Sequence, residues 1–269
     1  VTTYNINPER LQASLSSKTR AICITHLYGR ACDMAGITAF AQSYGLVIVE
    51  DCAQSHGAKF DGRMTGTYGL GCFSFYPTKN LGALGDAGVV TTDNDEWADK
   101  LRHLRNYGSK KKYFNQYVGY NSRLDELQAA FLLKKLSDLD YITAHKRALA
   151  TLYRQHLPAE LFHPAAIHPE QDVHHIFPIR HPRRDALKQF LLERDIKTEI
   201  HYPVPPHRQT AMQGRLKGDY PLADLIHDSI LSLPISPATS ADEVLQVCQA
   251  IQAFCVAHES DIQTASKSP

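Results

Sequence analysis

Features that mark several classes of protein are missing from this 269-residue sequence. It contains no apolar run long enough to cross a bilayer, and its start lacks the basic and apolar segments of a secretory leader. Its 29 basic and 28 acidic residues give a net charge of only +1, so no global field favours nucleic acid or an anionic membrane. We therefore expect a soluble cytoplasmic protein with neither nucleic-acid nor membrane partners.

Cysteine and histidine are present but lack the spacing of metal sites. The six cysteines form no C-x-x-C pair, and four of them lie in or beside apolar runs, as small core residues do in a reducing compartment. Among the 14 histidines, His174 and His175 are the only adjacent pair, and neighbours on a strand point to opposite faces. No metal site is expected.

The first half of the chain alternates apolar strand-like runs with helical segments. Leu46 to Val49 is an uninterrupted apolar run, which is typical of a strand buried on both faces of a parallel sheet. Asp33 can cap a helix that ends at Tyr44, with Gly45 as a left-handed terminator. This alternation predicts an α/β fold with a mostly parallel sheet flanked by helices. Further strands are expected over 20–26, 70–75 and 88–92, and further helices over 8–17 and from 93 or 94 to 108.

The second half consists of a long helical stretch followed by a smaller α/β domain. Apolar residues recur at steps of three and four from Leu124 to Ile142, so residues 122–157 are expected to be helical with a packed apolar stripe. From His174 onward we expect a strand, a helix over 184–194, a strand over 196–200 and two more helices. The predicted division is a large cofactor-binding domain over 1–160, a small C-terminal α/β domain over 161–258 and a disordered polar tail over 259–269.

Lys79 and Asp51 each follow a strand-like run. Ligands collect where the carboxyl ends of parallel strands meet, so the two side chains are expected at one edge of the sheet. Pyridoxal phosphate chemistry needs this combination: a lysine that binds the aldehyde and an acid that keeps the pyridine nitrogen protonated. A lysine exposed to water and an aspartate that caps a turn are the plainer alternatives.

Other motifs accompany this pair along nearly the whole chain: HLYG at 26–29, EDCAQ at 50–54, YNSRLDELQAA at 120–130, IHYP at 200–203 and LSLP at 231–234. Together they resemble the DegT/DnrJ/EryC1/StrS family of nucleotide-sugar aminotransferases. The resemblance implies the type I aminotransferase fold, pyridoxal 5'-phosphate as the cofactor, and a homodimer whose subunits share their active sites.

The resemblance also implies roles for five residues. Lys79 would carry the cofactor and move a proton during the reaction, which needs a neutral amine and hence a lowered pKa. Asp51 would pair with the pyridine nitrogen, and Gln54 would hydrogen-bond the ring oxygen. Ser74 would bind the cofactor phosphate, and Asn121 would reach the phosphate bound by the neighbouring subunit. The alternatives are a surface amide for Gln54, a small core residue for Ser74 and a helix cap for Asn121.

The segment KNLGALGD, which begins at Lys79, resembles the branch of the family that aminates 3-keto sugars on nucleotide carriers. The stretch NYGSKKKY at 106–113 is similar to enzymes that make 3-amino-3,6-dideoxyhexoses on dTDP. These likenesses imply a nucleotide-linked 3-keto-6-deoxyhexose as the amine acceptor and an amino acid, L-glutamate, as the donor. Tyr76, His201 and Tyr202 are expected to face the sugar, and Lys110 with the two lysines after it is expected to meet the nucleotide pyrophosphate.

Two other interpretations stay open. Compared with the family, roughly the first hundred residues of the large domain are missing, an order-of-magnitude comparison with typical domain sizes. That part carries a helix start that binds the phosphate, so a catalytically dead remnant or a sugar-nucleotide-binding regulator is the alternative from another class. A related sugar dehydratase is disfavoured, because that branch typically has histidine where this chain has Lys79.

Overall fold

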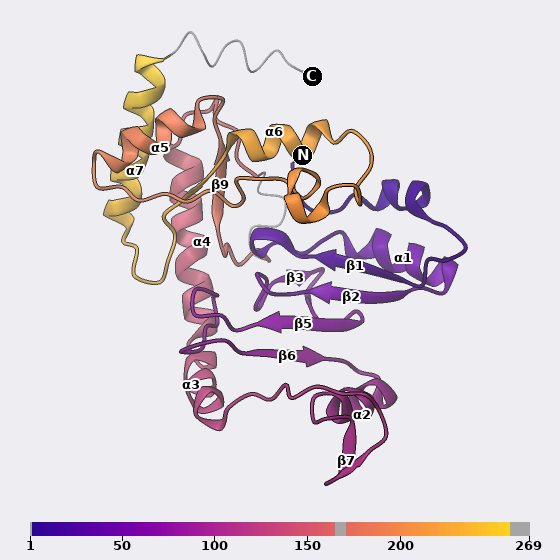
Figure 1. Ribbon diagram of the computed structural model, residues 1–269. Coiled ribbons are helices and arrows are strands. Elements are labelled where there is room, and N and C mark those ends of the chain that lie inside the picture. Colours follow the sequence, from indigo (N-terminus) through magenta and orange to yellow (C-terminus); the bar gives the residue numbers. More distant parts are fainter. Residues whose placement is uncertain (1, 165–170, 259–269) are drawn as a thin grey trace. The chain divides into compact units, whose positions relative to one another are not determined.

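The computed structural model describes residues 2–164 and 171–258 (Figure 1). The chain divides into two compact units. The first, called here the sheet unit, consists of Asn5–Thr143 and Glu170–His175. The second, called the C-terminal unit, consists of Val1–Tyr4, Ala144–Pro169 and Ile176–Pro269. The predicted tail over 259–269 lies outside the described residues.

The sheet unit is built on a four-stranded sheet in the order β1-β2-β5-β6. Strands β1 (Ala21–Thr25), β2 (Val47–Asp51) and β5 (Leu70–Ser74) run parallel, as predicted. Strand β6 (Gly88–Thr91) instead pairs antiparallel with β5. The connection between these two strands contains no helix to carry the chain back across the sheet, and parallel pairing usually requires such a crossover.

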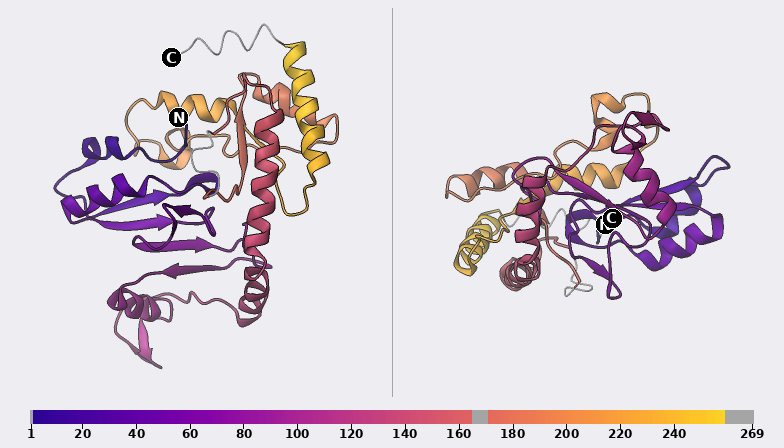
Figure 2. Two further views of the ribbon diagram at one scale, coloured as in Figure 1. Left: turned by 180° about the vertical axis from the view of Figure 1, so that it is seen from behind. Right: turned by 90° about the horizontal axis from the view of Figure 1, so that it is seen from below.

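One face of this sheet is covered by helix α1 (Met34–Tyr44) and the 3₁₀ helix η1 (Pro8–Ser14) (Figures 1 and 2). Helix α1 begins and ends as predicted, with the Asp33 side chain accepting from the Gly36 N–H and Gly45 in the left-handed conformation. The covered face buries side chains that alternate along β1 and β2. Strand β2 is therefore fully buried on one face only, whereas the sequence predicted burial on both faces. The buried apolar residues at the covered face include Ile22, Ile24, Ile48, Met34 and Ile37.

The rest of the sheet unit consists of short connections and helices. The carboxyl ends of β1, β2 and β5 lie at one end of the sheet, and helix α2 (Asp95–Leu104) lies toward the other (Figure 1). The predicted helix over 122–157 is two helices, α3 (Glu126–Leu136) and α4 (Leu139–His156), because the first ends at a cap on Ser137. The remaining elements are η2 (Leu27–Gly29), β3 (Lys59–Phe60), β4 (Arg63–Met64), β7 (Ser109–Lys111) and β8 (Phe114–Asn115).

The C-terminal unit surrounds the antiparallel pair β9 (Phe177–Arg180) and β10 (Ile230–Leu233). Helix α4 crosses from one unit into the other, and its second half packs Leu149 and Tyr153 into the core of this unit. The division therefore falls at residues 143 and 144, earlier than the boundary predicted at 160. The unit also contains α5 (Arg184–Leu192), η3 (Pro206–Arg208), η4 (Thr210–Met212), α6 (Pro221–Ser229) and α7 (Ala241–Ala257).

The strand predicted over 196–200 does not form. Within that segment the structure shows one isolated bridge, between Glu199 and Ser232. No helix within the described residues combines the length and the apolar character needed to cross a bilayer.

Candidate active site

Two of the predicted site residues, the acid and the phosphate ligand, lie at the ends of adjacent strands. Asp51 is the last residue of β2 and Ser74 is the last residue of β5. The two strands are parallel neighbours, so both residues lie at the same edge of the sheet. Lys79 follows Ser74 by one short turn, in which its N–H donates to the Tyr76 carbonyl at 2.9 Å. The sheet therefore brings an acid, a hydroxyl and an amine to one edge.

Asp51 faces the side of the sheet away from α1. It pairs in register with Thr25 on β1 and with Cys72 on β5. Its Oδ1 accepts from the Ala53 N–H at 3.0 Å, and its Oδ2 accepts from the Thr25 hydroxyl at 3.5 Å. These donors orient the carboxylate, which is half buried. Its negative charge acts on the amine of Lys79.

The Lys79 amine has the electrostatic setting that the predicted role requires. Burial lowers the pKa of Lys79 below its usual range, and the charge of Asp51 opposes this shift. The effect of desolvation on the pKa is larger than the effect of the Asp51 charge. At a given pH, a larger fraction of Lys79 is therefore neutral than of a lysine exposed to water. A neutral amine can attack an aldehyde and can accept a proton.

The loop that carries Lys79 is closed at its base. The Ala83 N–H donates to the Phe75 carbonyl at 2.7 Å, and the Phe75 N–H donates to the Ala87 carbonyl at 2.8 Å. Gly82 lies so close to the turn that an added Cβ would be 2.4 Å from the carbonyl oxygen of Pro77. The loop is therefore a compact turn that restricts the position of the Lys79 backbone.

Gln54 is buried beside the same edge. Its Oε1 accepts from the backbone N–H of Tyr28 at 2.7 Å, which orients the amide so that Nε2 is its donor end. A donor is what the oxygen on a pyridoxal ring would require. The hydroxyl of Ser74 accepts from the Tyr76 N–H at 3.3 Å, and the Tyr76 side chain is half exposed.

His56 was not assigned a role from the sequence, although it lies in the same motif as Asp51. Its ring is buried and packs against Phe73 and Phe75, with ring centroids at 5.5 and 5.6 Å. Burial lowers the pKa of His56 to about 4, the Ser74 backbone opposes this shift and the charge of Lys79 adds to it. An uncharged imidazole at this position avoids placing a second cation near Lys79.

Glu50 precedes Asp51 but faces the covered side of the sheet. Its carboxylate is fully buried and accepts from the backbone N–H groups of Gly66, Tyr68 and Gly69 at 2.7, 2.7 and 3.0 Å. Burial alone would raise the pKa of Glu50, but the hydrogen bonds from His26 and from this backbone outweigh it and lower the pKa below its usual range. This network was not predicted from the sequence.

His26, Glu50 and Cys52 place their ligand atoms within 4.8 Å of one another, close enough to share a metal ion. However, both ring nitrogens of His26 are engaged. Nδ1 accepts from the Cys32 N–H at 3.0 Å, so the proton is on Nε2, which lies 3.1 Å from Glu50 Oε2. Burial also raises the pKa of the Cys52 thiol to about 12, which disfavours the thiolate that a metal needs. The cluster is an internally hydrogen-bonded support for the end of β2.

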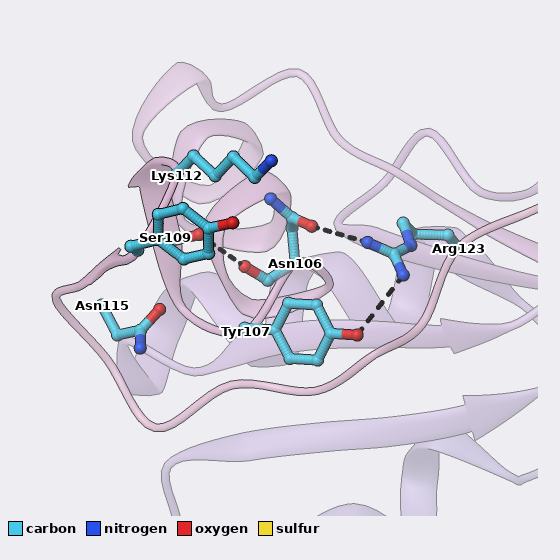
Figure 3. A pocket seen from close by; sticks show the side chains of 7 residues that line it. Asn106, Tyr107, Ser109, Lys112, Asn115 and Arg123 are labelled. Carbon is cyan, nitrogen blue, oxygen red and sulfur yellow. Dashed lines mark hydrogen bonds between the residues drawn. The ribbon is translucent and has the colours of Figure 1, made fainter.

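Asn121 and Lys110 lie in another part of the sheet unit. Asn121 forms an isolated bridge with Asn106, just after α2. Lys110 is exposed and its Nζ lies 3.4 Å from Asp99 Oδ1. The hairpin β7–β8 and its flanks border an open cavity of about 620 Å³ whose lining includes two cationic side chains (Figure 3). It is lined by Asn106, Tyr107, Ser109, Lys112, Tyr113, Asn115 and Arg123.

His201 and Tyr202 belong to the C-terminal unit. His201 Nδ1 lies 2.9 Å from the hydroxyl of Ser232, and the Tyr202 carbonyl accepts from Nδ1 of His227 at 2.6 Å. The Tyr202 side chain is about half exposed. Their predicted contact with the sugar stays a prediction.

The residues at the sheet edge fit a pyridoxal group. The edge offers an amine with a lowered pKa, a carboxylate oriented by two donors, a buried amide with its donor end defined and a strand-end hydroxyl. Each answers one requirement of that cofactor: covalent attachment, pairing with the ring nitrogen, hydrogen bonding to the ring oxygen and contact with the phosphate.

The chain is similar to known sugar transaminases. The chain is 45% identical over 256 residues to a dTDP-3-amino-3,6-dideoxy-alpha-D-galactopyranose transaminase of Aneurinibacillus thermoaerophilus, covering 94% of this chain and 70% of that protein. Among solved structures, it is similar to DesV of S. venezuelae in complex with a ketimine intermediate, with a TM-score of 0.90, 41% identity, and 93% and 69% of the two chains covered.

A second solved structure bears on the cofactor. NtdA from Bacillus subtilis with bound cofactor PMP superposes with a TM-score of 0.84 at 28% identity, covering 93% of this chain and 61% of that one. Pyridoxal 5'-phosphate is the cofactor of this group of aminotransferases, as the sequence predicted. The DegT/DnrJ/EryC1/StrS aminotransferase family matches residues 1–252. The chain therefore belongs to the DegT/DnrJ/EryC1/StrS aminotransferase family, and its fold is the type I aminotransferase fold expected from the sequence.

Proposed function

We propose that this chain transfers an amino group from L-glutamate to a nucleotide-linked 3-keto-6-deoxyhexose, with dTDP as the carrier, and that pyridoxal phosphate bound at Lys79 mediates the transfer. The observation that carries the proposal is the Lys79 amine, whose pKa is lowered by burial at a strand edge that also presents Asp51. The similarity to a dTDP-3-amino-sugar transaminase supports the substrate class. The lysine itself argues against dehydration.

When bound, the cofactor supplies an aldehyde that an amine can capture and a protonated ring that accepts electrons. The residues of the chain divide the remaining work. Lys79 would hold the cofactor through its aldehyde carbon, and once released its neutral amine would move a proton between the substrate carbon and the cofactor. Asp51 stabilises the proton on the ring nitrogen by its negative charge. Gln54 donates to the ring oxygen and Ser74 donates to the phosphate.

The proposed substrate contacts are cationic and aromatic side chains. We propose that Lys112 and Arg123, which line the cavity beside β7–β8, bind the nucleotide pyrophosphate of a substrate held in the neighbouring subunit's site. Lys110 contributes less, since it already lies beside Asp99. Tyr76, His201 and Tyr202 are the proposed sugar contacts.

The proposed assembly is a homodimer with shared active sites. Asn121 bridges to Asn106, two residues after the end of α2. Helix α2 lies toward the opposite end of the sheet from the carboxyl ends of β2 and β5 (Figure 1). This position suits a residue that completes the phosphate site of a neighbouring subunit. Mixing Lys79→Ala with Asn121→Ala protein should then restore activity, since one of the two sites in a mixed dimer has both residues intact.

The proposed chemistry is tested by capture of the cofactor. The chain is incubated with pyridoxal phosphate and reduced with borohydride, and its peptides are examined by mass spectrometry. We expect the cofactor on Lys79 in the wild type and in Lys59→Ala, a variant at an exposed lysine, and no capture in Lys79→Ala. Loss of the visible absorbance on adding L-glutamate, and its return with the dTDP-linked keto sugar, would support transfer. Equal capture by wild type and Lys79→Ala would contradict the assignment.

A further inference from the structure

Two side chains of helix α3 form hydrogen bonds with the loop that carries Lys79. Gln128 Oε1 accepts from the backbone N–H of Leu84 at 2.8 Å. Lys135 Nζ donates to the backbone carbonyl of Gly82 at 2.7 Å. Both partners on the loop are main-chain groups, so the contacts hold the path of the loop whatever side chains it carries.

These two residues lie on one face of α3 together with a buried leucine. Gln128 and Lys135 are separated by two helical turns, and Leu132 lies between them on the same side. Leu132 is buried and packs in one cluster with Leu81 and Ala83 of the loop. We call Gln128, Leu132 and Lys135 the α3 clamp. Its apolar centre and polar ends match the apolar side chains and the polar backbone of the loop.

The α3 clamp acts on the part of the loop that determines where Lys79 lies. Gly82 is three residues after Lys79, and its close approach to Pro77 joins the two arms of the turn. The adjacent Asn80 is buried and donates to the Val173 carbonyl at 2.9 Å, which anchors the turn from another direction. With its base closed at Phe75, the loop is held on three sides.

We propose that Gln128 and Lys135 are positioning residues that keep the Lys79 amine in its partly desolvated place near Asp51. The inference rests on the proposed role of Lys79 and adds the helix that places it. Neither residue touches the amine, so each acts through the backbone of the loop. Loosening the loop would let water reach the amine and would spoil its alignment, and misplacement of a reacting group by about 1 Å can cost on the order of 100-fold.

The chain offers matched controls. Lys134 is the neighbour of Lys135, carries the same charge and is exposed on α3. Lys134→Met therefore controls for the loss of a charge in Lys135→Met. Gln128→Glu keeps an acceptor for the Leu84 N–H that Gln128→Ala removes, and Lys135→Arg keeps a donor for the Gly82 carbonyl.

The first measurement needs no cofactor. Trace acetic anhydride labels each neutral amine of the full chain in competition, and the dependence on pH gives an apparent pKa for each lysine by mass spectrometry. We expect the pKa of Lys79 to lie below the usual range of a lysine in the wild type, and to rise in Gln128→Ala and Lys135→Met. Lys134→Met, Gln128→Glu and Lys135→Arg should keep the wild-type profile. A purely structural role would lower the melting temperature without moving this profile.

The second measurement is the rate of cofactor capture at Lys79, trapped by borohydride. We expect it to fall about tenfold in Gln128→Ala and in Lys135→Met, and to be unchanged in Lys134→Met. If either variant fails to fold, the other carries the test, since the two contacts are independent. Unchanged labelling and unchanged capture in folded variants would overturn the inference. Absence of capture in the wild type would instead contradict the proposed function, while the labelling profile would still decide whether α3 places the amine.

Discussion

Two consecutive acids at the end of β2 face opposite sides of the sheet and have different surroundings. Glu50 is fully buried on the side covered by α1, where three backbone N–H groups and His26 meet its carboxylate. Asp51 faces the other side, is half buried, and is oriented by the Ala53 N–H and the Thr25 hydroxyl. The more completely hydrogen-bonded acid holds the strand end in place, and the acid with fewer donors is the one suited to chemistry.

His26 and Thr25 link the two acids to the end of β1. The His26 ring meets Glu50 while its backbone N–H donates to the Asp51 carbonyl at 3.1 Å. Thr25, one residue earlier, meets the side chain of Asp51. Because neighbouring residues in an extended chain point to opposite sides, the dipeptide Thr25–His26 at the end of β1 supports both faces of the dipeptide on β2.

The largest expected effect separates the two acids by function. Asp51→Asn removes the charge that keeps the ring nitrogen protonated, so turnover should fall by on the order of 10²–10⁴-fold, the usual range for a lost acid–base contribution. The free energy of unfolding should change by less than about 1 kcal/mol, because the side chain is half buried and its donors remain near water. Steady-state turnover and urea unfolding check both, with Asp61→Asn as an exposed control.

The next effect is on stability. Glu50→Gln places an amide nitrogen among backbone donors, so it should lower the free energy of unfolding by about 3–5 kcal/mol, as loss of a buried charged partner does. Glu96→Gln, at an exposed position of α2, should change it by less than about 0.5 kcal/mol. A fall of similar size in both variants would show that the Glu50 network is not special.

Only part of this arrangement could be predicted from the sequence. The ends of β2 and β5 and their short distance along the chain from Lys79 made the edge predictable. The Glu50 network was not predictable, since it depends on the long-range register of β1 with β2 and on a loop whose backbone points three N–H groups at one carboxylate. Gln128 and Lys135 could not be distinguished from ordinary surface residues of a helix, because their partners are main-chain groups.

Local patterns also failed where tertiary context decides. The segment 196–200 has strand-like composition but forms one bridge with β10, which already pairs with β9. Three consecutive lysines look equivalent in sequence, yet Lys110 lies beside Asp99 while Lys112 lines the cavity. The alternation of residues along a strand and the turn residues between elements cannot specify which neighbour a flexible side chain meets.

A third prediction concerns the dependence of stability on pH. The pKa of His56 is lowered from 6.5 to about 4 in the folded chain, so as pH falls through 6.5 the unfolded chain takes up a proton that the folded chain does not. Stability from this residue is therefore full above pH 6.5 and is lost between pH 6.5 and 4, by up to about 3 kcal/mol. His56→Leu should flatten this part of the profile, and His156→Leu at an exposed site should not. If the wild type and His56→Leu had identical profiles of stability against pH, the burial of an uncharged His56 would be contradicted.

The smallest expected effect probes the hydroxyl beside Asp51. Thr25→Val keeps the shape of the side chain and removes a hydrogen bond at 3.5 Å, so we expect turnover to fall by no more than about fivefold, which corresponds to about 1 kcal/mol. Thr25→Ser should retain wild-type turnover. A larger loss in Thr25→Val than in Asp51→Asn would reverse the order of importance proposed for these two residues.

The most direct test measures unfolding and borohydride-trapped cofactor on Lys79 in the same two variants. Glu50→Gln should lower the free energy of unfolding while each folded molecule still takes up cofactor and transfers an amine. Asp51→Asn should unfold like the wild type and lose amine transfer. If both variants lose stability and transfer together, the two acids form one structural unit, and the division of labour between the faces of β2 is contradicted.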